Sequence, residues 1–204
     1  MTELELIKID PIIERIDYDA EEERELFLHC DSLEIEYRKK YKGMYGRMMS
    51  VPRGQASYTL DETIHYDYKV SGGSPPNKVM TPELKKITAH VNEKLGTNFN
   101  TILMNVYKTG NDCIGYHRDR ENGWAENSGF ATLSLGVTRD FQIRREVDKD
   151  TQTIPHESGM IIYMPHPMNH HYLHGVPVRK KVEGTRISLT FREIIDKVTD
   201  PDPA

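Results

Sequence analysis

Two segments of the chain place hydrophobic residues at the three- and four-residue spacing of an amphipathic helix. The first begins at Asp19, with Glu22 three residues later, as in a capping box. The second begins at Thr81-Pro82, a cap followed by a proline at the first helical position, and stops at Gly96. Both segments are therefore predicted to be helices, and the first is expected to cover the domain without taking part in chemistry. The apolar stripes are Leu26, Phe27, Cys30 and Leu33 in the first helix and Leu84, Ile87, Val91 and Leu95 in the second.

Later in the chain the pattern changes to short runs with the composition and two-residue period of β-strands. These runs cover residues 101–107, 130–137, 141–145, 160–163 and 185–191, with a turn at 110–112. Residues 55–58 and 64–70 also indicate β-structure before a Gly- and Pro-rich loop, and residues 1–16 predict a short strand and a turn. Many short strands after a helical region favour an α+β fold, a β-sandwich or jelly roll with helices packed on one side.

The last predicted strand has an apolar face typical of a core and an unusual polar face. The polar face carries Arg186, Ser188, Thr190 and Arg192, two hydroxyls flanked by two guanidiniums, without an acidic residue. At about 3.3 Å per residue the two arginine Cα atoms lie roughly 20 Å apart, so inward-reaching side chains could hold both ends of a small dicarboxylate. Guanidiniums bind carboxylates bidentately, which makes the pair chemically apt. The alternative is an ordinary exposed edge strand.

One imidazole and one carboxylate, His117 and Asp119, lie two residues apart in an extended segment and therefore point to the same side. A second imidazole from a distant segment would complete a two-histidine, one-carboxylate triad, which leaves open positions on Fe(II) for a co-substrate and dioxygen. Alone, this triplet is a weak signal, because most His-Asp pairs on protein surfaces bind nothing. The distant candidates are His166, His170, His171 and His174.

The composition describes a globular protein with one sizeable core. Its 204 residues are 37% hydrophobic and 29% charged, and no apolar run approaches the ~20 residues of a membrane span. The N-terminus is acidic where a secretory signal would be basic, so we expect an intracellular protein, nuclear or cytoplasmic, without membrane attachment. We also expect the protein to be a monomer. Cys30 and Cys113 are too few for a disulfide framework and fit a reducing compartment.

The net charge of −5 hides a strong asymmetry along the chain. Residues 1–36 hold 13 acidic and 3 basic residues, a charge of −10, so residues 37–204 carry +5. Residues 37–53 contain six basic residues and three tyrosines but no acidic residue. Because cations neutralise phosphates and aromatic rings stack on bases, this stretch favours a nucleic-acid surface, although a solvated basic loop has the same composition.

Several motifs, in this order, resemble those of the AlkB-type Fe(II)/2-oxoglutarate dioxygenases. They are Asn105 with Tyr107, His117 with Asp119, His174, and the strand from Arg186 to Arg192. Further segments at 50–58, 105–121 and 166–181 resemble a DNA-repair demethylase of that family. The resemblance covers about residues 44–194 and implies a double-stranded β-helix (jelly-roll) core. Residues 1–43 would then form an acidic N-terminal arm with its covering helix, and residues 195–204 a tail.

The resemblance also implies a cofactor set. Fe(II) would be held by His117, Asp119 and His174, because His174 alone precedes the Gly-Val-Pro that looks like the family pattern. The co-substrate 2-oxoglutarate would be bound at its distal carboxylate by Arg186 and Tyr107, and at its metal end by Arg192 and Asn105. Thr190 and Ser188 would line the same pocket, although Ser188 stands where the family usually has Asn. Dioxygen would be the oxidant.

The implied reaction is oxidative demethylation of N-alkylated bases such as 1-methyladenine and 3-methylcytosine, with release of formaldehyde, succinate and carbon dioxide. The base would be flipped out of double-stranded DNA into the pocket. By resemblance a finger at Tyr45 fills the vacated gap, a lid contains Tyr68 or Tyr66, and a basic loop grips the opposite strand. Arg120 replaces an acidic residue of the relative. The expected substrate contacts are Tyr45, Gly46, Arg47, Tyr66, Tyr68, Arg120, Glu121, Arg179, Lys180 and Lys181.

Other functions fit part of the same pattern. An oxygenase of this class could act on methylated RNA or on a protein side chain, since the iron site does not encode the substrate. A zinc hydrolase could use the triad, but it leaves the paired arginines unexplained. A nucleic-acid-binding jelly roll without turnover is a third alternative, and succinate formation would distinguish it from an enzyme.

Overall fold

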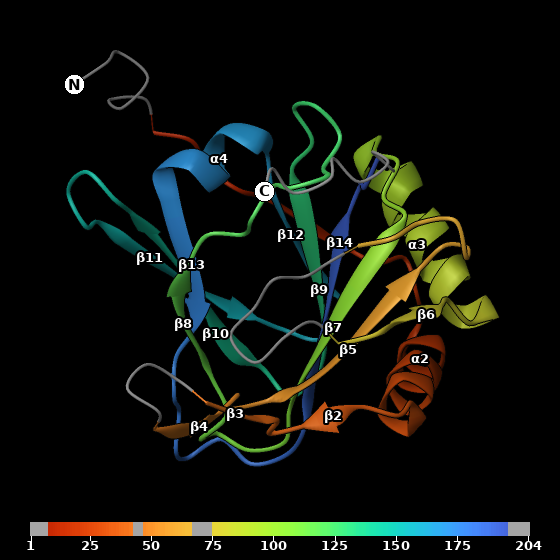
Figure 1. Cartoon of the computed structure of the whole chain (residues 1–204), viewed down its shortest axis with the longest axis horizontal. Helices are drawn as coiled ribbons and strands as arrows, with labels where there is room; N and C mark the ends of the chain where they lie inside the picture. The colour runs from red at the N-terminus through yellow and green to blue at the C-terminus, as the bar shows by residue number, and fades with distance from the viewer. Residues whose placement is uncertain (1–7, 43–46, 67–74, 196–204) are drawn as a thin grey trace, which may run out of the picture.

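Two largely antiparallel sheets face each other in the computed structural model of the chain, which describes residues 8–42, 47–66 and 75–195 (Figure 1). The large sheet has the order β1 (Ile12–Arg15), β12 (Met160–Met164), β9 (Phe130–Gly136), β14 (Arg186–Arg192), β7 (Thr101–Tyr107), β5 (Gly54–Thr59) and β2 (Glu36–Tyr37), with β6 (Asn77–Val79) parallel to β5. The small sheet has the order β11 (Thr151–His156), β10 (Arg139–Arg145), β13 (Tyr172–Val176) and β8 (Ile114–His117). This arrangement confirms the predicted α+β jelly roll.

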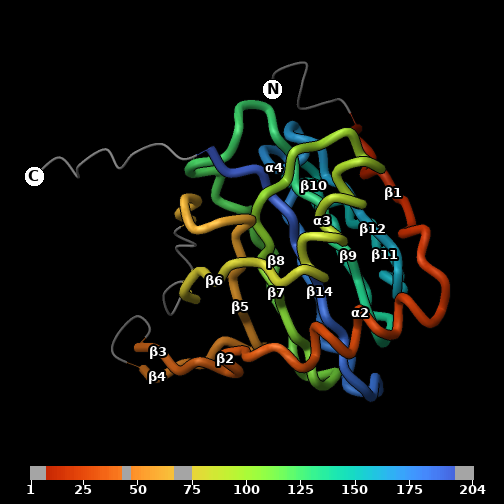
Figure 2. The backbone as a smooth tube through the Cα atoms, turned by 90° about the vertical axis from the view of Figure 1, so that its right-hand side faces the viewer, coloured from red at the N-terminus to blue at the C-terminus, as the bar shows by residue number. Residues whose placement is uncertain are grey.

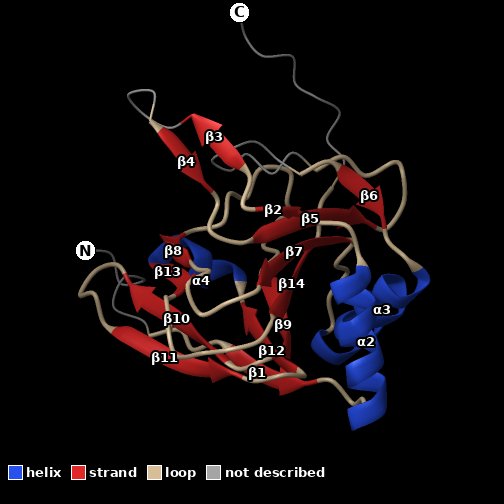
Figure 3. Ribbon diagram, turned by 90° about the horizontal axis from the view of Figure 1, so that it is seen from below, coloured by secondary structure: helices blue, strands red, loops and turns tan. Residues whose placement is uncertain are grey.

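Helices α2 (Ala20–Ser32) and α3 (Pro82–Leu95) lie side by side against the large sheet, as Figure 3 shows. Both begin where their caps predicted. The Asp19 carboxylate accepts from the amide of Glu22, whose own carboxylate accepts from the amide of Asp19 at 3.1 Å. Gly96 ends α3 in the left-handed conformation, with φ of 65°. The capping signals were sufficient here because they act within one turn of helix.

The alternation along β14 divides the interior into an apolar and a polar side. Ile187, Leu189 and Phe191 pack in one core cluster with residues of α2 and α3. The four polar residues of the same strand line a cavity between the two sheets. All seven residues of β14 are buried between β7 and β9, so the alternative of an exposed edge strand is excluded.

Several elements were not expected from the sequence. Besides three short strands between residues 36 and 50, these are β6, β11, β13 and the short helix α4 (His166–His171), whereas β8 lies where an extended segment was expected. A strand was also expected at residues 64–70. Residues 64–66 have no strand conformation, and residues 67–70 lie outside the described ranges. The missed strands are short, and those of the small sheet carry polar residues toward the cavity, which obscures the alternation that identifies a strand.

The described part of the N-terminal segment packs on the large sheet. Figure 2 shows β1 beside β12, where it forms one edge of the large sheet. The expected boundary near residue 43 falls between β3 (Lys40–Lys42) and β4 (Met48–Ser50), which pair with each other. Within the described residues no helix has the length and apolar character needed to cross a membrane.

Candidate active site

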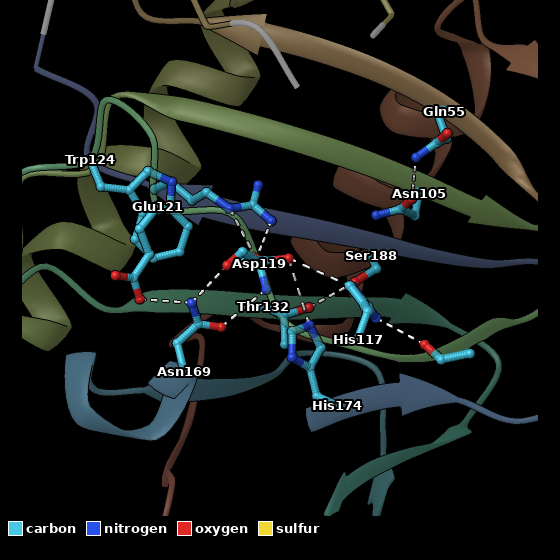
Figure 4. Close-up of polar contacts among 12 residues, drawn as sticks. Gln55, Asn105, His117, Asp119, Glu121, Trp124, Thr132, Asn169, His174 and Ser188 are labelled. Atoms are coloured by element: carbon cyan, nitrogen blue, oxygen red, sulfur yellow. Dashed lines mark hydrogen bonds and ion pairs between the residues drawn. The ribbon is translucent and has the colours of Figure 1, made fainter. Parts of the chain in front are cut away.

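The register of two neighbouring strands brings the predicted metal ligands together (Figure 4). His117 ends β8 and pairs directly with His174 of β13, and the two imidazole centroids lie 4.3 Å apart. Asp119 follows β8 by two residues and turns its carboxylate toward both rings. Of the four downstream histidines, only His174 joins this group, as the resemblance implied.

The ligand atoms are spaced as a bound ion requires. The Asp119 Oδ1 atom lies 3.6 Å from His117 Nε2 and 3.9 Å from His174 Nε2, and the three ligand atoms lie within 4.8 Å of one another. The His117 Nδ1 atom contacts the Gly115 carbonyl at 2.9 Å, which directs Nε2 toward the site. The His174 ring packs against Phe130 and Phe141, with centroids 4.9 and 5.6 Å away.

The charges of the site suit a cation. Burial alone would favour the neutral form of Asp119, but the Arg192 guanidinium and the two imidazoles outweigh it and hold the pKa of Asp119 well below its ordinary value. Burial and the neighbouring His117 lower the pKa of His174 to about 3. At neutral pH the site therefore offers an ionised carboxylate and a neutral buried imidazole, the forms that bind metals.

All six expected co-substrate residues line the same cavity as the triad. Adjacent strands β7 and β14 contribute them, and the register places Tyr107 across from Arg186 and Asn105 across from Ser188. The sequence could predict each face, but only strand pairing puts the two faces beside the metal ligands. The six are Asn105, Tyr107, Arg186, Ser188, Thr190 and Arg192.

Arg186 is buried and held in a fixed orientation. Its Nε donates to Ser134 Oγ at 2.9 Å, and its Nη2 lies 2.9 Å from His156 Nδ1. The guanidinium lies 5.2 Å from the centre of the Tyr107 ring. Its buried Nη1 has no hydrogen-bond partner among the described residues. A buried donor without a partner is costly, so this atom fits a carboxylate of a bound ligand.

His156 and Ser134 are functional candidates that the sequence analysis missed. The His156 Nε2 atom lies 3.0 Å from the Met160 carbonyl, which makes Nε2 the donor and leaves Nδ1 to accept from Arg186. Burial, reinforced by Arg186, lowers the pKa of His156 well below its ordinary value. An isolated His or Ser in a strand carries no signal of such a contact.

Arg192 and Asn105, both expected at the metal end of 2-oxoglutarate, also contact other side chains of the protein. Arg192 donates from Nε and Nη2 to Asp119 Oδ2, at 3.1 and 2.5 Å, so it binds the metal carboxylate itself. Asn105 lies four residues along the ladder from the partner of Arg192, and its Oδ1 accepts from Arg53 and Gln55 at 2.8 and 3.1 Å. Binding of 2-oxoglutarate by these two residues stays a prediction, and both line the cavity that holds the triad.

Asn169 of α4 is a further residue that the sequence analysis missed. Its Oδ1 accepts from the Asp119 amide at 3.1 Å, and its Nδ2 donates to the Asp119 carbonyl at 2.9 Å. The same Nδ2 donates to Glu121 Oε1 at 2.7 Å. Asn169 thus fixes the backbone that carries the metal carboxylate, and it also orients Glu121.

The structure divides the expected substrate residues into three groups. Arg47, Arg120, Lys180 and Lys181 are exposed, and Glu121 is half-buried. Tyr66 is buried in the core between the sheets, where its hydroxyl contacts Trp124 Nε1 at 3.4 Å, and its expected contact with the substrate stays a prediction. Tyr45, Gly46 and Tyr68 lie outside the described residues.

Half of the basic residues in the stretch at 37–53 contact other residues of the protein, so only part of the stretch is available to a nucleic acid. Arg53 is buried against Asn105, Arg38 binds the buried Asp112 at 2.7 Å, and Lys39 pairs with Glu36 at 3.0 Å. Lys40, Lys42 and Arg47 are exposed, and the Arg38 side chain is exposed as well despite its ion pair. In the basic loop at residues 179–181, which was expected to grip the opposite DNA strand, Arg179 pairs with Asp140 at 2.5 Å.

Comparison with known proteins agrees with this geometry. Residues 15–192 match the model of the 2OG-Fe(II) oxygenase superfamily. The chain is 39% identical over 160 residues to human DNA oxidative demethylase ALKBH2, which covers 74% of this chain and 60% of that protein. It is 28% identical over 137 residues to human alpha-ketoglutarate-dependent dioxygenase alkB homolog 3, covering 63% of this chain and 46% of that protein. The chain thus spans about three fifths or less of these two relatives.

A solved structure supports the fold independently. The structure of OsALKBH1 superposes with a TM-score of 0.59 at 17% identity, over 92% of this chain and 99% of that one. The expected resemblance to AlkB-type dioxygenases is confirmed, and with it Fe(II), 2-oxoglutarate and dioxygen as the cofactors that membership implies. The chain belongs to the 2OG-Fe(II) oxygenase superfamily.

Proposed function

We propose that this protein is an Fe(II)- and 2-oxoglutarate-dependent oxidative demethylase that acts on N-alkylated bases in DNA. The observation that carries the proposal is the buried cavity that joins the His117, Asp119 and His174 triad to the unpartnered Nη1 of Arg186. A metal site and a carboxylate site in one cavity are what an oxygenase of this superfamily needs. The similarity to a DNA oxidative demethylase supports DNA as the substrate.

In this proposal each group in the cavity has a defined task. His117, Asp119 and His174 would hold iron, while Arg186, supported by Ser134 and His156, would bind the distal carboxylate of 2-oxoglutarate. With dioxygen, the bound iron and co-substrate supply the oxidation of an N-methyl group. Arg192 keeps Asp119 ionised and binds its Oδ2 atom, so that Oδ1 faces the two imidazoles.

The exposed part of the basic stretch supports a nucleic-acid substrate. Lys40, Lys42 and Arg47 lie on or beside the paired strands β3 and β4, together with Met48 and Met49, which are 62% and 47% exposed. Cations for phosphates beside apolar side chains suit a surface that grips a duplex and inserts between bases. Double-stranded DNA with a flipped-out 1-methyladenine or 3-methylcytosine is the substrate that we propose.

The other substrate-side assignments stay predictions. They include the finger at Tyr45, the lid at Tyr68, base contacts by Arg120 and Glu121, and phosphate contacts by Lys180 and Lys181. A monomeric state in a nuclear or cytoplasmic, reducing compartment is likewise proposed, and the two free cysteines, Cys30 and Cys113, agree with the reducing environment.

The test is an activity assay with matched oligonucleotides. The protein, iron, ascorbate and 2-oxoglutarate are incubated with 1-methyladenine or 3-methylcytosine in duplex DNA, single-stranded DNA and RNA, and base masses and succinate are measured. We expect demethylation of DNA, favouring the duplex, and none with His117→Ala. Demethylation of RNA alone would establish the RNA alternative. Succinate formed without base repair would favour protein hydroxylation, and the absence of succinate would leave a binding module.

A further inference from the structure

A second cluster of metal-ligating side chains lies outside the proposed iron site. Glu121, from the loop after β8, meets His166 and His170 of α4, and one ligand atom of each lies within 4.8 Å of the others. The two histidines are four residues apart on a helix, so their rings lie on the same face, with centroids 4.7 Å apart. None of the three belongs to the triad that would hold iron.

The geometry points to a binding site for a divalent ion of the Zn²⁺ class, and we propose that Glu121, His166 and His170 are its ligands. Two ligands at about 2.0–2.1 Å from a tetrahedral ion are separated by roughly 3.4 Å. The separation between His170 Nε2 and Glu121 Oε2 is 3.3 Å. Two imidazoles and one carboxylate form a donor set that zinc accepts, with water in the fourth position.

The carboxylate of this cluster is oriented by a buried neighbour. Asn169 is 3% exposed, and its Nδ2 donates to Glu121 Oε1 at 2.7 Å. That contact leaves Oε2 directed at His170. Carboxylates that bind a metal are commonly oriented in this way, by a hydrogen bond from a neighbouring residue. The simpler interpretation of the contact is an ion pair between Glu121 and a protonated His170, which would involve no metal and would not need His166.

The site is open to solvent, as an exchangeable metal site must be. The His170 side chain is 49% exposed and that of Glu121 is 26% exposed, whereas Asp119 and His174 of the triad are almost fully buried. An ion could therefore enter the second site directly from solvent, without passing through the co-substrate cavity. The exposure also means that His170→Ala removes a ligand without creating a cavity in the core.

The test measures how many zinc ions each protein molecule binds. The full chain, without an affinity tag, is stripped of metal and dialysed against micromolar Zn²⁺, and bound zinc is measured by mass spectrometry. Wild-type protein should bind two equivalents, since the triad also accepts zinc. His117→Ala and His170→Ala should each bind one, and the double variant none. His171→Ala, a change of the neighbouring histidine on the same helix, should still bind two.

Each other outcome overturns the proposal. One equivalent in the wild type, no loss in His170→Ala, or an equal loss in His171→Ala would mean that the cluster is not a specific site. Retention of the second equivalent in His166→Ala would show that His166 is not a ligand and would contradict the three-ligand site. The readout is independent of demethylase activity, so failure of the proposed DNA substrate would leave the result intact.

Discussion

At the scale of single residues, Asp119 connects the two halves of the proposed active site. One carboxylate oxygen faces the imidazoles, and the other accepts from Arg192. Since both Asp119 and Arg192 are buried, each compensates the charge of the other. The residue that would bind the metal is therefore also structural, and a substitution there should affect binding and stability together.

We expect Asp119→Asn to abolish iron binding and turnover and to lower the free energy of unfolding by roughly 3–5 kcal/mol, because it leaves a buried guanidinium uncompensated. Iron content and denaturant unfolding measure the two effects. Asp148→Asn is the matched control, since it removes an exposed carboxylate paired with Arg145 and should cost less than about 1 kcal/mol. Equal stability losses in the two variants would contradict the compensating role of Asp119.

His156 makes stability depend on pH. Its pKa is depressed in the folded state by burial and by Arg186, whereas in the unfolded chain it takes up a proton near pH 6.5. The stabilisation is thus complete above pH 6.5 and is lost as the pH falls below it, with a slope approaching about 1.4 kcal/mol per pH unit. Urea unfolding of metal-free protein between pH 7.5 and 5.5 should show this decline.

The matched variant for that measurement is His156→Gln. Its amide can accept from Arg186 and donate to the Met160 carbonyl but does not titrate in this range. The contribution of His174, whose pKa is also depressed, is common to both proteins. The pH slope of His156→Gln should be shallower by one proton, and parallel curves would show that His156 is not the titrating group.

At the scale of elements, the close approach of β8 and β13 positions the two histidines. A Cβ atom on Gly175 would lie 2.9 Å from the Ile114 carbonyl oxygen and 3.2 Å from the Gly115 carbonyl, both backbone atoms of β8. The register of this strand pair also shifts between His174 and Val176. Glycine is therefore required for the strands to meet at this point.

Gly175→Ala should move β13 away from β8, separate His174 from His117, and raise the dissociation constant for Fe(II) at least tenfold, measured by anaerobic titration. Steric crowding should also cost about 1–3 kcal/mol of stability. Gly115→Ala is the control, because among the described residues nothing beyond its chain neighbours lies within 4 Å of its added Cβ. If both variants bound iron like the wild type, spacing between the strands would not determine the site.

At the scale of the whole molecule, the charge is arranged on separate surfaces. The exposed lysines of β3 follow closely in the chain on the acidic segment that forms β1 and α2, but Figure 3 shows β3 and β4 extending away from both sheets. Lys40 and Lys42 are two residues apart on one strand, so they project from the same side. A projecting pair of cations is placed to meet phosphates.

If these cations bind DNA, the double variant Lys40→Ala/Lys42→Ala should bind duplex DNA with a weaker dependence on salt. The slope of the logarithm of the binding constant against the logarithm of salt concentration should become shallower by about 0.9 for each phosphate that the variant no longer neutralises. Fluorescence anisotropy at several salt concentrations measures the slope. Lys85→Ala with Lys86→Ala on α3 changes the net charge equally at another surface and should leave the slope unchanged. Equal effects of the two pairs would indicate a general charge effect rather than a binding surface.

The sequence by itself determined the features that depend on near neighbours. The caps at Asp19 and Thr81, the two faces of β14 and the spacing of His117 and Asp119 are local, because each follows from backbone geometry over a few residues. The resemblance of motifs then identified the superfamily, which the family match confirmed. The elements that these local signals predicted form in the folded protein, because the tertiary contacts favour the same local structure.

The tertiary structure shows which distant residues come into contact. Pairing of β8 with β13 brings His174, which only the motif resemblance had singled out, beside His117. Packing between the sheets buries Tyr66, and Arg53 turns inward to Asn105 although Lys40 and Lys42 of the same basic stretch are exposed. Strand register and side-chain direction depend on partners many residues away, and a residue's type does not encode them. The physical reason is that a site in a jelly roll is assembled across strands, whereas sequence patterns describe one strand at a time.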